Sequence, residues 1–187
     1  MLSDAQLEEM AVKMHVPLEG IYFKNSLPKL KYNRSFILNM EDEVDSDGKP
    51  NDGSHWVALQ INKDRDGRIS PIYFDSFGCE PPVAVRDAVK RFCGKFLPHC
   101  SKDVQSLVSD TCGYWVMAFL HWINASQFRS GELYSDVACF LEMFSDLNVE
   151  TDFSRNEWIL KHFFRSDDPS RRVPIEILKR QRPAQRH

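Results

Sequence analysis

The chain has 187 residues, of which 42% are hydrophobic and 27% charged, a size and composition typical of one globular domain with its own core. Its formal net charge of −3 argues against a protein that coats nucleic acid. No apolar run approaches the roughly 20 residues that span a bilayer, and the acidic opening MLSDAQLEEM lacks the apolar core of a signal peptide. We therefore expect a soluble intracellular protein, or one packaged in a particle made inside a cell.

The chain contains five cysteines, an odd number, and without a secretory signal reduced thiols are expected. One of them could be a nucleophile, although most cysteines are small buried hydrophobic residues. Two patterns imitate metal sites but are incomplete. Asn62–Gly67 opens like a calcium loop, yet Tyr73 stands where the loop needs a bidentate glutamate. Cys93, His99 and Cys100 lack a second ligand pair with zinc spacing, so we expect neither a metal nor an organic cofactor.

The N-terminal part of the chain predicts a helix, a loop and a strand. Ser3 and Gln6 have capping-box spacing, in which each side chain satisfies the other residue's backbone donor. The apolar face of this helix consists of Leu7, Met10, Ala11 and Met14. Prolines and a glycine between residues 17 and 28 predict a loop, and Ser35–Asn39 is an apolar run typical of a buried strand. Residues 41–54 are acidic and contain glycine and proline, which predicts a surface loop.

A hairpin and a series of helices are predicted next. His55–Ile61 alternates as a strand does, Asp66-Gly67 is a strong turn signal, and Ile69–Phe74 returns as the second strand. The other expected elements are helices at 83–97, 112–122, 133–145 and 155–164 and a short strand at 104–107. The apolar side of the first of these helices consists of Val85, Ala88, Val89, Phe92 and Phe96. The pattern indicates an α+β fold in which a central mixed sheet packs against the buried helix at 112–122.

A cysteine directly ahead of a long apolar helix is the first candidate for chemistry. Asp110-Thr-Cys112-Gly is a polar loop that ends where the helix begins. A helix N-terminus carries partial positive charge and free N–H groups, which favour a reactive thiolate and can hold an oxyanion. Gly113 would leave room for a substrate backbone. Gln105, seven residues before Cys112, could donate to the same oxyanion; the alternatives are a buried structural cysteine and a solvated glutamine.

His55 and Asp75 are the candidates for general base and orienting acid. His55 begins the first hairpin strand, and Asp75 follows the second. With the turn centred between Asp66 and Gly67, His55 lies opposite residue 78 and Asp75 opposite residue 58, so a bulge or a slipped register is needed to bring the two side chains together. The alternatives are a polar strand end for His55 and a turn former for Asp75.

A series of short motifs, in a fixed order along the chain, resembles the adenovirus-type maturation proteases, the adenain family, whose wider relatives process SUMO and other ubiquitin-like proteins. The motifs are His55-Trp56, Asp75-Ser-Phe-Gly78, Gln105 and Asp110-Thr-Cys112-Gly113. The resemblance covers most of residues 1–164 and is looser around 41–53 and 79–103. It departs from adenain at the acid, which is glutamate there and aspartate in the SUMO proteases, and either carboxylate can orient an imidazole.

The resemblance implies an adenain-like cysteine protease fold over residues 1–165 and a role for each motif. Cys112 would be the nucleophile, His55 its base and Asp75 the residue that orients the histidine. Gln105 would form the oxyanion hole together with the backbone N–H of Cys112. The reaction implied is peptide-bond hydrolysis by a thiol protease through an acyl-enzyme, with no cofactor.

The resemblance also implies substrates and a setting. The expected substrates are viral capsid or core precursors cleaved at small-residue sites containing glycine, in the virion and in the cytoplasm or nucleus of the infected cell. Trp56 and Gly113 would contact the substrate, with ordinary strand packing as the alternative for Trp56. We expect a monomer that does not associate with a membrane. The alternative functions are a deconjugating protease for SUMO or another ubiquitin-like modifier, and a catalytically idle binding module.

The C-terminal tail at 166–187 is expected to be weakly structured and basic. From Lys161 onward the chain has eight basic and three acidic residues, a net charge of +5 that leaves −8 for the rest. Adenain is stimulated by DNA and by a short basic peptide, and Ile177–Arg182 is similarly apolar and then basic. The tail could therefore bind DNA or act as a built-in activating peptide; a solvated tail is the alternative.

Overall fold

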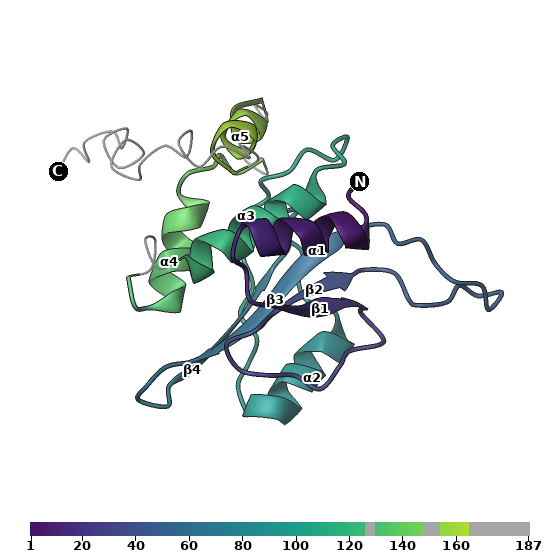
Figure 1. Ribbon diagram of the computed structural model, residues 1–187, viewed down its shortest axis with the longest axis horizontal. Helices are drawn as coiled ribbons and strands as arrows, with labels where there is room; N and C mark the ends of the chain where they lie inside the picture. The colour runs from purple at the N-terminus through teal and green to yellow at the C-terminus, as the bar shows by residue number, and fades with distance from the viewer. Residues whose placement is uncertain (126–129, 148–153, 165–187) are drawn as a thin grey trace.

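The computed structural model of the chain describes residues 1–125, 130–147 and 154–164. A four-stranded sheet lies between helices (Figure 1). Its strands are β1 Leu18–Phe23, β2 Ser35–Asn39, β3 Trp56–Lys63 and β4 Ile69–Phe74. The helices are α1 Asp4–Lys13, α2 Val83–Cys93, α3 Cys112–Asn124, α4 Leu133–Leu141, α5 Ser154–Ile159 and the π-helical η1 Leu160–Phe164. None of the helices in these ranges is long and apolar enough to cross a membrane.

The sheet is mixed, as the sequence predicts for an α+β protein. β1 runs parallel to β2, whereas β2 with β3 and β3 with β4 are antiparallel. The prediction of a loop over residues 17–28 is wrong for β1, which pairs with β2 through an irregularity between Leu18 and Gly20. Pro17 and Pro28 lie outside this strand, so neither proline removes a hydrogen bond from the ladder.

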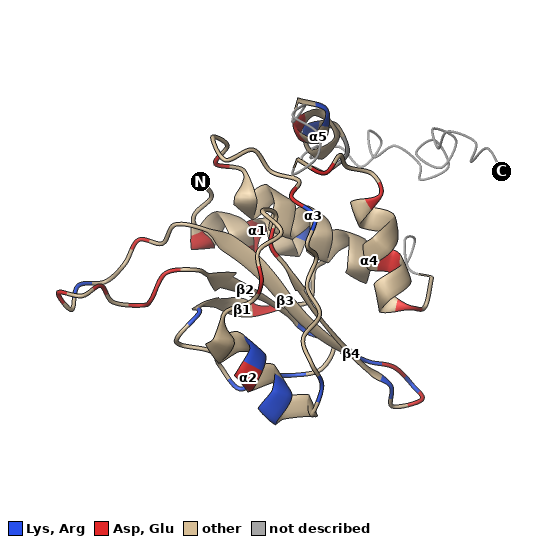
Figure 2. Cartoon of the chain, turned by 180° about the vertical axis from the view of Figure 1, so that it is seen from behind, with Lys and Arg blue, Asp and Glu red and all other residues tan. Residues whose placement is uncertain are grey.

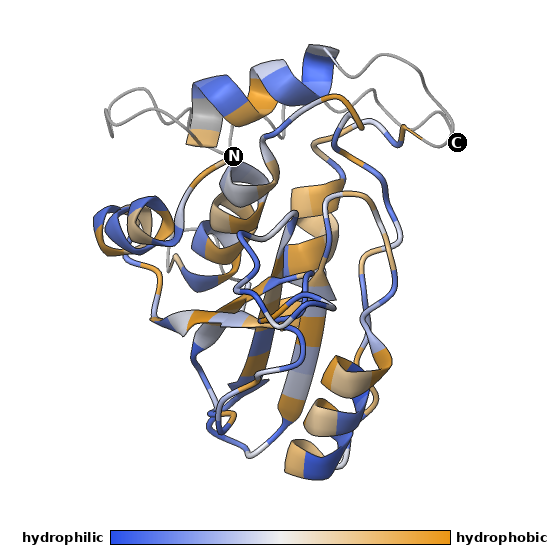
Figure 3. Cartoon of the chain, turned by 90° about the vertical axis from the view of Figure 1, so that its right-hand side faces the viewer, coloured by the Kyte–Doolittle hydropathy of each residue, from blue (hydrophilic) through white to orange (hydrophobic). Residues whose placement is uncertain are grey.

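Two hydrophobic clusters, one on each face of the sheet, explain why α3 is almost entirely apolar. α1, α3 and α4 pack on one face and α2 packs on the other. α3 lies between the sheet and its neighbouring helices, and eleven of its residues are buried. α2 packs on the other face of the sheet and is amphipathic. Its ribbon, at the bottom of Figure 3, is coloured as a mixture of hydrophobic and hydrophilic residues. A buried helix without a polar face holds its first residue in a fixed position.

The predicted hairpin forms, with a register that differs by one residue from the predicted one. Pairing runs from Ala58 opposite Phe74 to Lys63 opposite Ile69, which leaves a five-residue turn. Continued past its last pair, this register places His55 opposite Phe77 instead of residue 78. A one-residue shift moves side chains to the other face of a strand. The structure thus contains the one-residue slip in strand register that the sequence allowed but could not establish.

Two predicted elements are shorter or absent. α2 ends at Cys93 because Gly94 follows in the left-handed conformation, with φ of 71°, and Phe96 is consequently 85% exposed instead of lying on the apolar face. Residues 104–107, predicted as a strand, are irregular. The N–H groups of Val104 and Gln105 both bond to the carbonyl of Ser76, so this segment joins the end of β4 without extending the sheet.

The remaining predictions agree with the structure where it describes the chain. The Ser3–Gln6 capping box is present at α1. The helix predicted at 133–145 is α4, which is shorter than predicted and ends at Leu141. The helix predicted at 155–164 is α5 continued by η1. Acidic side chains are frequent along the 41–54 loop, and basic ones cover much of α2 (Figure 2). The prediction of a basic tail at 166–187 lies outside the described residues.

Candidate active site

The end of the β3–β4 hairpin carries the histidine and the acid. His55 directly precedes β3, and its carbonyl accepts a hydrogen bond from the N–H of Met40 at the end of β2. Asp75 directly follows β4 and is 1% exposed. The Nε2 atom of His55 lies 2.8 Å from Oδ1 of Asp75. The structure therefore brings together the two side chains that the sequence could only place at neighbouring strand ends.

Asp75 is held in one orientation by a turn. Its Oδ1 atom also accepts a hydrogen bond of 2.8 Å from the N–H of Phe77. The ring of Phe77 stacks on that of His55, with centroids 4.7 Å apart. Gly78 closes the turn by donating to the Asp75 carbonyl; its φ is +70°, and a Cβ there would lie 2.6 Å from the carbonyl oxygen of Ser101. A glycine is required for this close approach.

The neighbours of His55 influence its protonation. A carboxylate only accepts, so Nε2 of His55 donates to Asp75. Burial by itself lowers the pKa of His55. Interactions with Asp75 and with Cys112 outweigh this effect and raise the pKa to about 9.

Cys112 is the first residue of α3, as the sequence predicts. The N–H groups of Tyr114 and Trp115 bond to the Thr111 carbonyl and begin the helix. The Cys112 side chain belongs to the hydrophobic cluster beneath the sheet, and the residue is only 3% exposed. The start of α3 therefore sets the position of Cys112, which is almost fully buried.

Gln105 is bonded both to the neighbour of Asp75 and to the loop that precedes Cys112. It is 1% exposed, and its Oε1 atom accepts a hydrogen bond of 2.7 Å from the hydroxyl of Ser76, the neighbour of Asp75. Its Nε2 atom donates to the carbonyl of Ser109 at 2.8 Å. These two bonds fix the orientation of the amide. The nitrogen carries two hydrogens, and the bond to Ser109 uses one of them; donation to an oxyanion stays a prediction.

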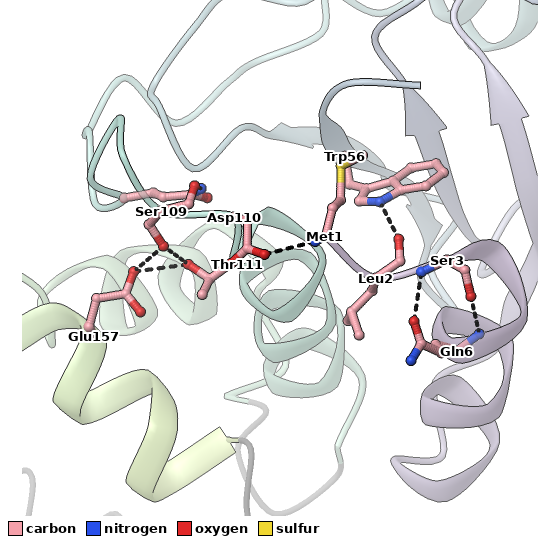
Figure 4. Close-up of polar contacts among 10 residues, drawn as sticks. Met1, Leu2, Ser3, Gln6, Trp56, Ser109, Asp110, Thr111 and Glu157 are labelled. Atoms are coloured by element: carbon pink, nitrogen blue, oxygen red, sulfur yellow. Dashed lines mark hydrogen bonds and ion pairs between the residues drawn. The ribbon is translucent and has the colours of Figure 1, made fainter. Parts of the chain in front are cut away.

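The first residues of the chain lie against the two predicted substrate-binding residues. The indole N–H of Trp56 donates to the Leu2 carbonyl at 3.0 Å, and Trp56 is 3% exposed (Figure 4). A Cβ on Gly113 would meet the side chains of Leu2 and Leu7 at 3.1 to 3.3 Å. In this conformation both residues pack against the N-terminal segment, and their contact with substrate stays a prediction. The α-ammonium group of Met1 is also 2.8 Å from the carboxylate of Asp110.

Three residues of the site were not singled out from the sequence. Ser76 and Phe77 lie inside the motif Asp75-Ser-Phe-Gly78, so their proximity to the acid could have been inferred. Glu157 of α5 accepts hydrogen bonds from Ser109 and Thr111 (Figure 4), and the sequence gives no signal for this contact. All five cysteines are free, and in residues 1–125, 130–147 and 154–164 no three side chains of His, Cys, Asp or Glu form a metal-binding group.

Comparison with known proteins finds similarity in structure only. No family model and no curated protein matches the chain. The chain is similar in structure to the ASFV pS273R protease. The match to its crystal structure has 16% sequence identity and a TM-score of 0.47, and covers 87% of this chain and 65% of that one. The match to the crystal structure of its selenomethionine form has 18% identity and a TM-score of 0.37, and covers 74% of this chain and 64% of that one.

Proposed function

We propose that the protein is a cysteine endopeptidase in which Cys112, His55 and Asp75 form the catalytic triad. The observation that carries the proposal is the pair of His55 and a buried carboxylate, together with a cysteine at a helix N-terminus. The Nε2 atom of His55 lies 2.8 Å from Oδ1 of Asp75, and both Asp75 and Cys112, the first residue of α3, raise the pKa of the ring. Such an arrangement is needed to activate a thiol, and a structural cysteine does not require it.

The proposed reaction begins from a thiolate of Cys112 beside the imidazolium of His55. The thiolate attacks the carbonyl carbon of the scissile peptide bond, and the oxyanion that forms is stabilised by Gln105 and the backbone N–H of Cys112. His55 then donates its proton to the leaving amine, which departs and leaves a thioester on Cys112. A water molecule gives a proton to neutral His55 and attacks the thioester. Loss of the acid product restores the ion pair.

The low exposure of Cys112, 3%, supports substrates with small residues at the cleavage site. A buried thiol disfavours bulky side chains next to the scissile bond, which agrees with the glycine-containing sites that the adenain resemblance implies. We therefore place viral capsid or core precursors first among the substrates, with the enzyme acting in the virion or infected cell. The aspartate at position 75, shared with SUMO proteases, supports deconjugation of a ubiquitin-like modifier as the second candidate.

A turnover assay tests the proposal. Wild-type protein is expected to cleave a peptide in which Gly-Gly precedes a fluorophore, and Cys112→Ala to reduce kcat to background, a loss of up to about 10⁶-fold, while a melting curve shows that the variant is still folded. Cys139→Ala is the matched control, because Cys139 is an exposed thiol outside the site. Turnover retained in the Cys112 variant would reject the triad. Cleavage of a SUMO fusion but not of a capsid precursor would favour the second candidate.

A further inference from the structure

The irregular segment 104–111 connects two residues of the proposed active site. It carries Gln105 at one end and leads directly into Cys112 at the other, yet it belongs to no helix or strand. Its tip packs on little of the protein, since Leu107 and Val108 are 84% and 89% exposed. A regular element fixes its side chains through backbone hydrogen bonds, so an irregular segment with two functional residues needs other partners.

Helix α5, more than 40 residues further along the chain, supplies these partners from two adjacent residues. Asn156 is fully buried, and its Nδ2 atom donates to the Val104 carbonyl at 3.1 Å, next to Gln105. Its remaining bonds, to the N–H and carbonyl of Ser145, fix the Asn156 amide itself. The beginning of the segment is therefore attached to α5 through one side chain.

Glu157 holds the other end of the segment. Its Oε1 atom lies 3.0 Å from the Ser109 hydroxyl and 2.9 Å from the Thr111 hydroxyl, and these two oxygens are 2.6 Å apart (Figure 4). In the two bonds to Glu157 the hydroxyls of Ser109 and Thr111 donate and the Oε1 atom accepts.

The contact with Glu157 also changes what Thr111 does for helix α3. Thr111 occupies the N-cap position, where a threonine hydroxyl commonly bonds to an N–H of the first turn. Here the hydroxyl bonds to Glu157 instead. The N–H groups in the first turn of α3 therefore do not donate to the Thr111 side chain. They lie next to the place where the oxyanion would form.

We propose that Glu157 is a positioning residue for the active site: through Ser109 and Thr111 it fixes Cys112 and the Gln105 amide relative to one another. The link to Gln105 passes through Ser109, whose carbonyl accepts from the Gln105 Nε2 atom. Glu157 touches neither the substrate nor the reacting atoms in this role. The inference rests on the proposed protease function, and it extends that function to a control of the site by α5.

The experiment compares Glu157→Ala with Glu157→Gln and Thr111→Val on the Gly-Gly fluorophore peptide. Glu157→Ala should lower kcat by about 10- to 100-fold, the loss expected when reacting groups are displaced by about 1 Å, with KM changed by less than about threefold. Glu157→Gln keeps an accepting oxygen and should retain kcat within about fivefold of wild type. Lys161→Ala, an exposed residue of the adjoining η1, is the matched control and should behave as wild type.

Coupling separates positioning from a general loss of stability. If Glu157 acts through Thr111, the double variant Glu157→Ala/Thr111→Val should be little slower than the slower single variant. The inference would be overturned if Glu157→Ala kept the wild-type kcat. It would also be overturned if the Ala and Gln variants lost the same factor in kcat, or if the losses of the two single variants multiplied in the double variant. If Glu157→Ala does not fold, the Gln and Val variants still decide it.

A second readout distinguishes failure of this inference from failure of the protease proposal. The rate at which iodoacetamide alkylates Cys112, followed by mass spectrometry, needs no substrate. Glu157→Ala should lower this rate about tenfold or more if the nucleophile is displaced. An unchanged rate rejects the role of Glu157, whereas a lowered rate in a protein whose wild type cleaves no peptide supports the role and rejects the protease.

Discussion

The two halves of the candidate site are built in different ways. His55 and Asp75 lie at the ends of two paired strands, and the backbone ladder between β3 and β4 fixes their spacing. Gln105 and Cys112 are joined by the irregular segment 104–111, which is fixed by side-chain contacts with Ser76 and Glu157. The hairpin half depends on bonds between residues near in sequence, and the loop half on residues from distant parts of the chain.

This difference predicts how each half responds to substitution. A backbone ladder tolerates replacement of a single side chain, so variants in the hairpin half should alter the chemistry of the histidine while the geometry persists. A segment held by side chains has few alternatives, so variants in the loop half should disturb geometry and chemistry together.

Asp75→Asn should lower kcat by up to about 10⁴-fold, as expected when the group that orients a catalytic histidine loses its charge. Asparagine can still accept from His55 and from the N–H of Phe77, so the hairpin should fold. Without the carboxylate, burial lowers the pKa of His55 and only Cys112 opposes it. The alkaline limb of the pH profile of kcat/KM should move to lower pH, and an unmoved limb would contradict the assignment.

The same contact links folding stability to pH. The pKa of His55 is raised from 6.5 to about 9, so its protonation in the folded state contributes stability that is fully present below about pH 6.5 and lost as the pH rises through about 9. The contribution is up to about 3 kcal/mol. Denaturant unfolding at about pH 6 and about pH 10 should show a smaller decline in Asp75→Asn than in wild type, and parallel declines would contradict the linkage.

Gln105→Ala should lower kcat by about 10²- to 10³-fold, the usual loss for one oxyanion donor. KM should change little, because the oxyanion exists only in the transition state. Ser76→Ala provides a comparison, since it frees the Gln105 carbonyl oxygen without removing a donor to the oxyanion, and its loss should be smaller. Steady-state kinetics in which the effect falls on KM alone would make Gln105 a substrate-binding residue.

Trp56→Phe should have the smallest kinetic effect. The variant keeps an aromatic ring in the core but leaves the Leu2 carbonyl without its donor, at a cost of about 1–3 kcal/mol in the free energy of unfolding. Trp122→Phe, which loses an indole bond to the Asp136 carbonyl at the other end of α3, is the matched control. Both variants should unfold more easily and keep near-wild-type kinetics. A rise in KM for Trp56→Phe alone would support contact between Trp56 and the substrate.

The sequence predicts the hairpin half of the site more completely than the loop half. Strand alternation and Asp66-Gly67 are local signals, and they place His55 and Asp75 at neighbouring strand ends. The register could not be read from them, because the five-residue turn of the structure shifts every pair by one relative to a centre between Asp66 and Gly67. The apolar run that begins at Cys112 likewise predicts α3, since a helix buried on all sides needs no polar face.

What the sequence could not predict depends on contacts between distant segments. β1 is stabilised by pairing in parallel with β2, and its prolines and glycine read locally as a loop. The segment 104–111 bonds to Ser76 and to α5, and neither partner leaves a periodic pattern in the sequence. The contact of Glu157 with Thr111 spans 46 residues, so only the folded chain shows that the two meet.

The most direct test of the central claim is the order in which the cysteines react with iodoacetamide at neutral pH, mapped by peptide mass spectrometry. Cys79 and Cys139 are exposed and Cys112 is 3% exposed. Burial and the nearby carboxylates of Asp75 and Asp103 also raise the pKa of Cys79, which lowers its thiolate fraction. We expect Cys112 to react first despite its burial, because His55 favours its thiolate, and we expect His55→Ala to abolish this preference. Labelling that follows exposure, with Cys79 and Cys139 modified while Cys112 is not, would contradict the assignment of Cys112 as a nucleophile.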